Sequence, residues 1–540
     1  MKLILQYFRD AIRAFPRQFA VSMCIIVAMT VMNTCIPWGL RQYLDAVTEC
    51  NNYGVLVIGV GLFAAYLMGK VFVNIAWFVS LDRFGGKYIE TLTLSLERAM
   101  AATSYAEIEK KQAGVIQNIL YTDVLNVFRV IGHAAPAMFG AFTVVLASLA
   151  LSFFYDLKLT LFICLAAALG LLLSFCSRKA LARTAGKTNV QLKEHNAWCT
   201  QFVNMLPLVQ CNNILPYYLK RTEENIREFI VTSIEEDKRT LFWSGTVTGY
   251  HSLFTIALSA LLAIPASGNS VANLVFFTMI ANMVMEQAQS AELLLQQIIK
   301  AYVSFEHVDG LRKLPKSHGE EQAGPVETIE FEAVSFSYPA GGSPALDGVS
   351  LRLQKGDSIL LQGRNGSGKS TFLKLLTGLY LPTEGEIRID GRPAETYSRE
   401  SLNERILYVN QDEGCLNETF REYLTILSGA PLSAERFAEL LRFVDLPEEE
   451  RRIAGNGASL SVGQRKKLFL MKLLLRYEKA SVVILDELTA GLDAETAQKT
   501  SALLAELFSK GDKIFIVVDH APPEALSFSR RLEFREGKLL

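Results

Sequence analysis

Long apolar stretches constrain this chain more than any other feature, because they recur along residues 18–300. A helix rises about 1.5 Å per residue, so about 20 apolar residues are needed to cross about 30 Å of hydrocarbon. Several stretches meet this requirement, which predicts an α-helical polytopic membrane domain in contact with a lipid bilayer. The six predicted spans are residues 18–40, 55–79, 130–154, 159–176, 241–264 and 271–291.

The segment before the first span, KLILQYFRDAIRAF, is amphipathic. At helical spacing its apolar side chains fall on one face, and these are Ile4, Phe8, Ala11, Ile12 and Phe15. Such a stripe predicts a helix that lies in the membrane interface. The apolar run that follows has no short polar cleavage region, which argues against a signal peptide.

The distribution of lysine and arginine predicts the orientation in the membrane. In the short loops after the first, third and fifth spans, Arg41 and Lys158 are the only lysine or arginine residues. The N-terminus and the loops 80–129 and 177–240 are rich in charged residues of both signs. Positive-inside counting places both termini and the two long loops in the cytoplasm of a multi-pass protein of the cell membrane. Apolar residues at helical spacing within these loops predict helices that continue about six turns or more into the cytosol.

The sixth span carries polar residues on one helical face, namely Asn282, Glu286, Gln289 and Gln296. Glu286 is expected about 22 Å from the outer end of the span, inside the inner leaflet. A carboxylate at that depth faces either protein or a watery cavity. Two interpretations of this face stay open, the lining of a transport cavity and plain packing between helices.

Composition supports a division of the chain into two parts. Hydrophobic residues make up 50% of the chain, yet charged residues still make up 20%. We expect a membrane domain over residues 1–312, a polar linker over 313–326 (KLPKSHGEEQAGPV) and a second domain over 327–540. Short β-branched runs alternate there with helical stretches, which predicts an α/β domain with a largely parallel sheet. The net charge of −1 offers no basic field for a nucleic-acid partner.

The second domain contains a phosphate-binding motif. The apolar run SILLQ (358–362) leads into GRNGSGKST, which fits the pattern G-x-x-x-x-G-K-[ST]. Glycines let backbone N–H groups converge on phosphate oxygens, Lys369 neutralises the β and γ charges, and Ser370 offers its hydroxyl to Mg²⁺. The predicted phosphate-binding residues are Gly363, Arg364, Asn365, Gly366, Ser367, Gly368, Lys369, Ser370 and Thr371.

Two later strands are predicted to end in polar side chains at the same sheet edge. VVILDE (482–487) ends in Asp486, placed to hold a magnesium shell, and Glu487, placed to polarise an attacking water. KIFIVVDH (513–520) ends in His520. A lone histidine is more often structural, but beside a phosphate loop a contact to the γ-phosphate is favoured. The predicted catalytic residues are therefore Glu487, His520 and Lys369.

With these motifs in this order, the second half resembles the ATP-binding cassette of an ABC transporter, a P-loop NTPase fold. The whole chain resembles an exporter-type half-transporter. The resemblance implies that Tyr338 in FSYPA stacks on adenine and that Gln411 in YVNQDE senses Mg²⁺, with Ser370 and Asp486 as the other metal-site residues. It further implies that Asp493 in TAGLD touches a partner cassette. The coupling helices would lie around Tyr105–Gly114 and Pro207–Tyr218.

The same resemblance gives a role to a short motif far from the phosphate loop. LSVGQ, formed by Leu460, Ser461, Val462, Gly463 and Gln464, would be the signature that caps the γ-phosphate of ATP held by the opposite cassette. Since this chain has one cassette, it would dimerise with a second half-transporter, either identical or different. Departures from the family pattern are Val462, the RKK run after the signature, Asn456 and Asp519.

The leading functional hypothesis is an ATP-hydrolysing translocase that uses ATP and Mg²⁺ to export or flip an amphipathic compound, a lipid or a peptide. One alternative is an exporter-fold importer of metal chelates. An alternative of another class is an ATP-gated regulatory or channel-like membrane protein, against which the intact Glu487 and His520 argue. The substrate and the direction of transport are left open by the sequence, because the residues lining a cavity are spread over several helices.

Overall fold

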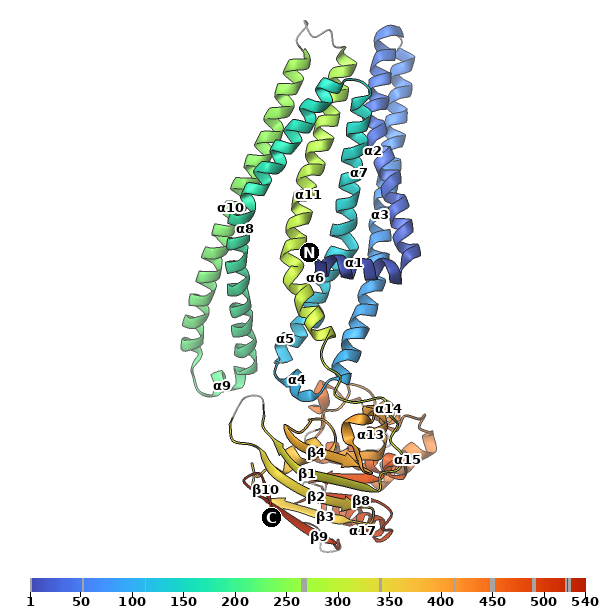
Figure 1. Cartoon of the computed structure of the whole chain (residues 1–540), viewed down its shortest axis with the longest axis vertical. Helices are drawn as coiled ribbons and strands as arrows, with labels where there is room; N and C mark the ends of the chain where they lie inside the picture. Colours follow the sequence, from blue (N-terminus) through green and yellow to red (C-terminus); the bar gives the residue numbers. More distant parts are fainter. Residues whose placement is uncertain are drawn as a thin grey trace. The chain divides into compact units, whose positions relative to one another are not determined.

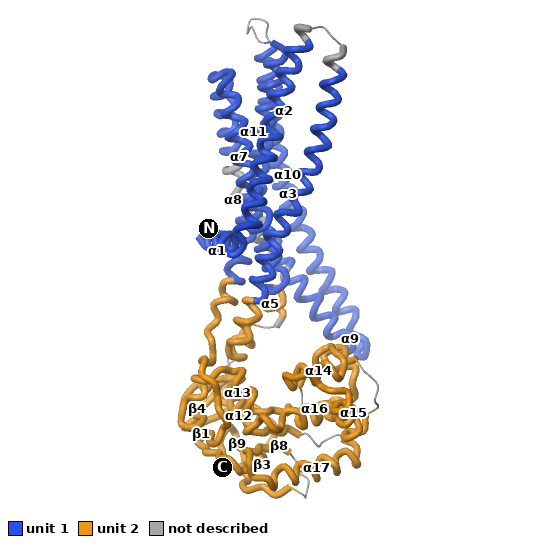
Figure 2. The backbone as a smooth tube through the Cα atoms, turned by 90° about the vertical axis from the view of Figure 1, so that its right-hand side faces the viewer, with its two compact units in different colours: residues 1–94, 119–308 blue, residues 95–118, 309–540 orange. Residues whose placement is uncertain are grey.

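A computed structural model describes residues 2–50, 53–111, 113–263, 270–338, 342–410, 413–446, 452–487, 492–519, 522 and 526–540. The chain divides into two compact units, shown in Figure 2. Unit 1 comprises residues 1–94 and 119–308, and unit 2 comprises residues 95–118 and 309–540. Each unit has its own hydrophobic core.

Unit 1 is helical, and its helices are labelled in Figure 1. They are α1 (Lys2–Ala14), α2 (Pro16–Cys50), α3 (Tyr53–Ala102), α6 (Val124–Phe128), α7 (Ala135–Phe153), α8 (Leu157–Asn204), α9 (Leu206–Cys211), α10 (Leu215–Ala263) and α11 (Val271–Arg312), with the π-helical turns η1 (Ile119–Asp123) and η2 (Arg129–Ala134) before α7. The last residues of α3, after Leu94, and of α11, after Val308, belong to unit 2. The amphipathic helix expected before the first span is α1, whose buried residues are Ile4, Tyr7 and Ala11.

Within the described residues, five helices are long and apolar enough to cross a membrane. They are Pro16–Val47, Val57–Ala102, Gly114–Phe153, Leu215–Ala263 and Val271–Arg312. The remaining predicted span, 159–176, falls on Leu157–Leu173, a shorter apolar part of α8, beyond which many side chains lie outside the described residues. Five full-length candidates and one shorter stretch thus agree broadly with the six predicted spans.

Several helices are much longer than a bilayer requires. Helix α3 has 50 residues, α8 has 48 and α10 has 49. At about 1.5 Å per residue each is about 70 Å long, more than twice the hydrocarbon thickness. The expectation that the long loops continue as helices is therefore confirmed. Ion pairs four residues apart, such as Arg227 with Glu223 and Arg239 with Glu235, line the exposed surface of the α10 extension.

One hydrophobic cluster of unit 1 lies where α8, α10 and α11 meet. Ile163, Leu258, Phe276 and Ile280 are fully buried in this cluster. By contrast, α3 leaves large apolar side chains such as Phe72 exposed, as expected of a surface that faces lipid.

Unit 2 contains a six-stranded sheet in the order β10-β9-β3-β8-β7-β6. All neighbouring strands in it are parallel except β10 and β9. Its strands are β3 (Ser358–Gly363), β6 (Ile406–Val409), β7 (Val482–Asp486), β8 (Ile514–Val518), β9 (Arg530–Arg535) and β10 (Lys538–Leu539). Strand β8 is buried along its whole length, which explains its unbroken apolar sequence. The predicted, largely parallel sheet is confirmed.

A second sheet of four antiparallel strands has the order β2-β1-β4-β5. Its strands are β1 (Thr328–Phe336), β2 (Leu346–Gln354), β4 (Glu384–Ile389) and β5 (Arg392–Pro393). The helices that follow the linker in this unit are α12 (Lys369–Leu376), α13 (Arg399–Arg405), α14 (Phe420–Ser428), α15 (Ala434–Phe443), α16 (Val462–Arg476) and α17 (Ala494–Ser509). Along β3, Ile359 and Leu361 enter one core cluster and Leu360 the other, because side chains alternate across a strand.

Residues 95–118, with α4 (Tyr105–Glu109) and α5 (Ala113–Asn118), belong to unit 2 although they are distant from it in sequence. The linker packs against the same unit. Its Ser317 N–H donates to the Ala102 carbonyl at 3.0 Å, while Ala323 and Val326 are buried in the core. The two compact units therefore differ from the predicted domains 1–312 and 327–540, because each predicted domain is one continuous stretch of the chain.

Candidate functional site

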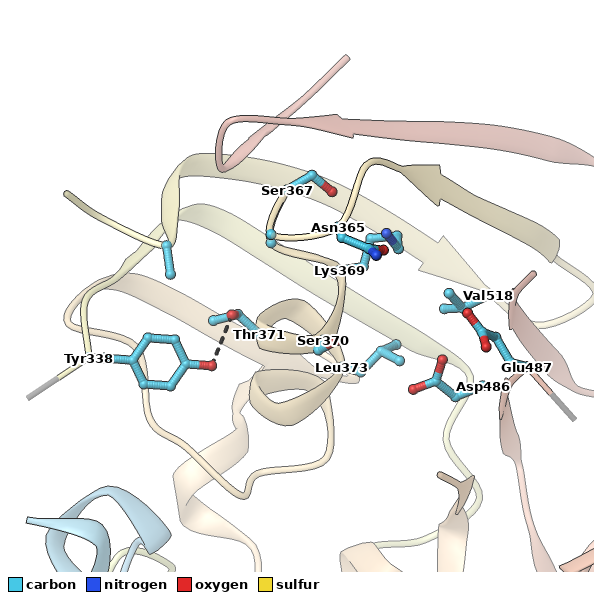
Figure 3. Close-up of a pocket in the computed structure, with 13 residues that line it drawn as sticks. Tyr338, Asn365, Ser367, Lys369, Ser370, Thr371, Leu373, Asp486, Glu487 and Val518 are labelled. Atoms are coloured by element: carbon cyan, nitrogen blue, oxygen red, sulfur yellow. Dashed lines mark hydrogen bonds between the residues drawn. The ribbon is translucent and has the colours of Figure 1, made fainter. Parts of the chain in front are cut away.

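A cavity of about 460 Å³ lies where the loop after β3, the start of α12 and the end of β7 meet (Figure 3). It is lined by Tyr338, Ala345, Asn365, Gly366, Ser367, Gly368, Lys369, Ser370, Thr371, Leu373, Asp486, Glu487 and Val518. The predicted phosphate-binding loop and both predicted carboxylates therefore surround one space. Gly363 and Arg364 line a neighbouring cavity together with Lys369.

The phosphate-binding loop depends on glycine at its junction with α12. Gly368 has φ 111° and precedes Lys369, the first residue of the helix. A Cβ at Gly368 would lie 2.8 Å from the Ala345 carbonyl oxygen, so no larger residue fits. This turn leaves the first N–H groups of α12 directed at the cavity, without a side-chain cap at Gly368. Such a helix start attracts phosphate.

Two polar groups of the loop are suited to phosphate oxygens. Lys369 Nζ donates to the carbonyl oxygens of Gly363 and Arg364 at 2.6 and 3.1 Å, so the ammonium group lies across the loop. Ser367 Oγ is buried and has no hydrogen-bond partner in the described residues. A buried hydroxyl is normally paired. The loop thus offers a positive charge and an unsatisfied donor to an anion.

Tyr338 lies at the end of the cavity away from the two carboxylates (Figure 3). Its hydroxyl shares a hydrogen bond of 3.1 Å with Thr371 Oγ1, the second hydroxyl residue of α12. Its ring packs edge-on against Phe336 and Tyr380, with centroids 5.1 and 5.7 Å away. These contacts hold an aromatic ring at the wall of the cavity, where a flat base can stack.

The two carboxylates at the end of β7 are held differently. Asp486 Oδ2 accepts a hydrogen bond from the Tyr408 hydroxyl at 3.2 Å. Glu487 has φ 49°, a left-handed conformation that is strained for glutamate. Its N–H donates to the Val518 carbonyl at 2.9 Å, and its own carbonyl accepts from Lys466 Nζ at 2.6 Å. Backbone contacts on both sides therefore turn Glu487 out of the strand.

Within the described part of the chain, no group of three or more His, Cys, Asp or Glu side chains is placed to hold a metal ion. The Ser370 hydroxyl and the Asp486 carboxylate do line the same cavity. Oxygen ligands of this kind suit Mg²⁺, which usually takes its other ligands from phosphate and water. Gln411 and His520, predicted to act at this site, lie outside the described residues.

The predicted signature, residues 460–464, is the start of α16 and does not line this cavity. Ser461 is the N-cap, its Oγ accepts from the Gln464 N–H at 3.2 Å, and Gln464 Oε1 accepts in return from the Ser461 N–H at 3.1 Å. This capping box fixes the helix start, while Val462 is 65% exposed beside it. The motif is therefore open to a neighbour from outside its own site.

Asp493 is the N-cap of α17 and accepts from the Thr496 N–H at 2.9 Å. Lys467 Nζ lies 2.9 Å from its other carboxylate oxygen. The Lys467 ammonium, followed by the Thr496 backbone, holds the pKa of Asp493 well below its usual range. The aspartate predicted to meet a partner cassette is thus ionised and held to the signature helix.

Several residues near the site were not assigned a role from the sequence. Besides Lys466, these include Lys472, whose Nζ contacts both Glu413 carboxylate oxygens at 2.6 and 2.7 Å and the Tyr408 carbonyl at 3.0 Å. Burial lowers the pKa of Lys472, and the Glu413 carboxylate opposes that shift. The sequence did hold a clue to these contacts. Several lysines fall on the apolar face of α16, and a buried lysine needs a hydrogen-bond or ion-pair partner.

The first predicted coupling segment contacts the rest of unit 2. The Tyr105 N–H donates to the Leu379 carbonyl at 3.1 Å, and the Tyr380 hydroxyl donates to Glu109 Oε2 at 2.8 Å. Burial, followed by the Glu109 hydrogen bond, raises the pKa of Tyr380. Tyr380 also packs against Tyr338 in the cavity wall and against Tyr105 in α4, so one residue contacts both. The second predicted segment, Pro207–Tyr218, contains most of α9 and belongs to unit 1.

Part of the polar face of α11 is explained by helix packing. Asn282 Oδ1 accepts from the Thr255 hydroxyl at 3.0 Å, and Gln289 Nε2 donates to Thr248 Oγ1 at 3.1 Å. Both partners lie on α10. Glu286, between them, is exposed on this chain. Packing therefore accounts for Asn282 and Gln289, and the role of Glu286 stays a prediction.

Comparison with known proteins finds a matching family model for each part of the chain. A family model described as "ABC transporter transmembrane region" matches residues 19–288, half of the chain, and one described as "ABC transporter" matches residues 346–490. The chain has the fold of a bacterial Atm1-family ABC exporter solved with ATP bound, with a TM-score of 0.83 over 97% of this chain and 94% of that one at 16% identity.

Sequence relatives are named as flippases. An ATP-dependent lipid A-core flippase of Photobacterium profundum is 35% identical over 223 residues, 40% of this chain and 36% of that protein. One of Chromobacterium violaceum is 28% identical over 394 residues, 68% of this chain and 65% of that protein. The chain thus spans between about a third and two thirds of the length of these relatives.

Proposed function

This chain belongs to the ABC transporter family, as an exporter-type half-transporter with a membrane domain and a cassette, and on that premise we propose that it is an ATP-driven exporter or flippase of an amphipathic lipid. The observation that carries the proposal is the single cavity shared by the phosphate-binding loop, Asp486 and Glu487. ATP hydrolysis requires phosphate binding and a polarised water in one place, and these residues supply both.

Each part of the cavity has a distinct task in this proposal. Lys369 and the N–H groups at the start of α12 bind the β- and γ-phosphates, and Tyr338 stacks on the adenine. Ser370 and Asp486 would hold Mg²⁺, which would supply positive charge to offset the charge that develops on the phosphate groups. The Glu487 carboxylate orients the attacking water and accepts its proton as the water oxygen bonds to the γ-phosphorus, while the bond from that phosphorus to the bridging oxygen breaks and ADP leaves.

The site is incomplete without a second cassette. The signature at the start of α16 does not line the cavity of its own chain, and its helix start is a ready anion site. In the proposed dimer, Ser461 and Gly463 of one protomer cap the γ-phosphate bound by its partner. Hydrolysis then opens the pair, and α4, held to Tyr380, carries the movement toward the membrane helices.

A lipid is the favoured substrate class because the relatives named above are lipid A-core flippases. The long apolar helices place the chain in the bilayer, where such a substrate resides. The proposed orientation, with the cassette and both termini in the cytoplasm, follows from the lysine and arginine bias of the long loops.

A flipping assay with a matched variant tests this proposal. The purified protein is reconstituted into liposomes that contain a fluorescent phospholipid, and the leaflet in which the probe lies is followed after addition of ATP and Mg²⁺. We expect ATP-dependent movement with wild type and none with Glu487→Gln, whose hydrolysis should fall about 10² to 10⁴-fold while ATP binding persists. Equal hydrolysis by wild type and Glu487→Gln would reject the assignment of the base.

The two parts of the proposal can fail separately. Hydrolysis that depends on Glu487, without movement of any lipid probe, would retain the ATPase and reject lipid as the substrate.

A further inference from the structure

Another cavity, of about 540 Å³, lies between α2 and α3 in unit 1. Its wall consists of four residues from each helix, namely Arg17, Gln18, Val21 and Ile25 of α2 and Ala76, Val79, Ser80 and Arg83 of α3. We call these eight residues the α2–α3 groove. Arg17 is the first of the four α2 residues and Arg83 is the last of the four α3 residues, and the other lining residues are mainly apolar.

The depth of the groove follows from the spacing along α2. Arg17 and Arg41 are 24 residues apart, or about 36 Å along a helix, and the stretch between them contains no other charged residue. This length slightly exceeds the hydrocarbon thickness of about 30 Å. Arg17 therefore lies at the interface next to α1. Val21 and Ile25 follow one and two turns deeper, about 6 and 12 Å into the apolar layer.

The charged groups of the groove are available to a ligand. Arg17 and Arg83 are both exposed, and in the described part of the chain neither guanidinium has a hydrogen-bond or ion-pair partner. The neighbouring Asp82 pairs instead with His133, at 2.9 Å. Two unpaired cations at one cavity repel each other unless an anion lies between them.

The apolar wall is equally uncovered. Val21 is 55% exposed and Val79 is 40% exposed, so the chain itself does not fill the space between the helices. Contacts between α2 and α3 nevertheless hold the base of the groove in place. Ser22 and Ser80 are buried and share a hydrogen bond of 2.6 Å across the two helices, and Phe19 packs against the fully buried Phe84. The groove is therefore preformed.

We propose that the α2–α3 groove binds an anionic phospholipid from the leaflet next to α1. Its phosphate lies between Arg17 and Arg83, and an acyl chain lies along Val21, Ile25 and Val79. Guanidinium groups bind phosphate through paired N–H donors, and basic pockets between membrane helices suit anionic head groups. A soluble anion would satisfy the arginines but would leave the apolar wall exposed. The proposal does not depend on whether the chain transports lipid.

Lipid retention measured on the intact protein tests the site. The full chain is purified in detergent, exposed to vesicles of phosphatidylglycerol and phosphatidylcholine in equal amounts, and its bound lipid is counted by native mass spectrometry. We expect wild type to retain phosphatidylglycerol preferentially. The double variant Arg17→Gln/Arg83→Gln should lose that preference roughly tenfold or more, since two charge-assisted contacts are removed.

A charge-matched control separates a site from general attraction. Arg9→Gln/Arg13→Gln removes two exposed arginines of α1 and should leave the preference unchanged. A third variant, Val79→Trp, fills the groove while keeping both arginines, and it should also reduce retention. Loss of the preference in the α1 control to the same extent as in the groove variant would overturn the proposal. Full retention by Val79→Trp, or equal retention of the two lipids by wild type, would also overturn it.

Discussion

The ammonium group of Lys466 lies 2.6 Å from the backbone carbonyl oxygen of Glu487. This contact joins the buried face of the signature helix to the residue proposed as the general base. Lys466 is only 6% exposed, and Glu487 has the strained φ of 49°. A left-handed glutamate persists only where its surroundings hold it, so the lysine is a positioning residue for the base.

Replacing Lys466 should therefore impair turnover more than nucleotide binding. In Lys466→Met the Glu487 carbonyl loses a charged donor, and kcat for ATP should fall about tenfold or more. KM should change little, because the phosphate loop is untouched. Steady-state ATPase measurements give both values. Lys510→Met, an exposed lysine on the same unit, is the control, and a fall in kcat of the same size there would contradict a role specific to Lys466.

Mixing two inactive variants tests whether nucleotide sites are shared between two copies of this chain. A Ser461→Ala chain keeps its phosphate loop and a Lys369→Ala chain keeps its signature, so a mixed dimer contains one intact composite site. In an equal mixture about half of the dimers are mixed, and ATPase should recover to about a quarter of the wild-type rate. Activity no higher than that of either variant alone would exclude a shared site between identical chains.

The contact between Tyr380 and Glu109 should transmit nucleotide state to the membrane domain. Tyr380→Phe keeps the ring that packs against Tyr105 but removes the hydroxyl bonded to Glu109. Lipid-stimulated ATPase should fall about fivefold, as expected for one hydrogen bond, with basal ATPase unchanged. Tyr477→Phe is the matched control, since Tyr477 also donates to a carboxylate, Asp512. Equal effects of the two variants would count against a coupling role.

Acid should weaken the packing of the linker against unit 2 through His318. Burial, followed by the Arg399 charge, lowers the pKa of His318 to about 4, with Glu400 opposing the shift. Its ordinary value is about 6.5, so the unfolded chain takes up the proton first on acidification. Stability is therefore fully present above about pH 6.5 and is lost as the pH falls toward about 4.

The measurement is the thermal unfolding temperature between about pH 7.5 and about pH 5. It should fall on acidification by a few degrees less in His318→Gln than in wild type. His195→Gln, in unit 1, should follow wild type, and an unchanged slope in His318→Gln would refute the assignment.

Much of the site was predictable because its motifs are local in sequence. The loop from Gly363 to Ser370 and the acids at the end of β7 are recognised from a few adjacent residues, and a parallel sheet necessarily brings their strand ends to one edge. The helical extensions of the membrane spans were also predictable, because apolar residues recur at helical spacing in the long loops.

Contacts between distant segments were not predictable from one sequence. Lys466 with Glu487, Lys472 with Glu413, and Tyr380 with Glu109 each join segments whose approach depends on the packed fold. The antiparallel sheet was missed for the same reason, since its strands β1 and β4 are separated by the phosphate loop and α12. Patterning indicates which residues are buried but not which residues they meet.

Helix α3 runs without a break from Tyr53 to Ala102, and its residues after Leu94 belong to unit 2. An unbroken helix behaves as a stiff rod, so a tilt at one of its ends is carried along its whole length. From Leu94 to Tyr53 it extends about 60 Å, and over that length a tilt of about 5° displaces the far end by about 5 Å. The Tyr53 end of α3 would therefore be displaced by roughly the width of one side chain, although the helix had turned by only a few degrees.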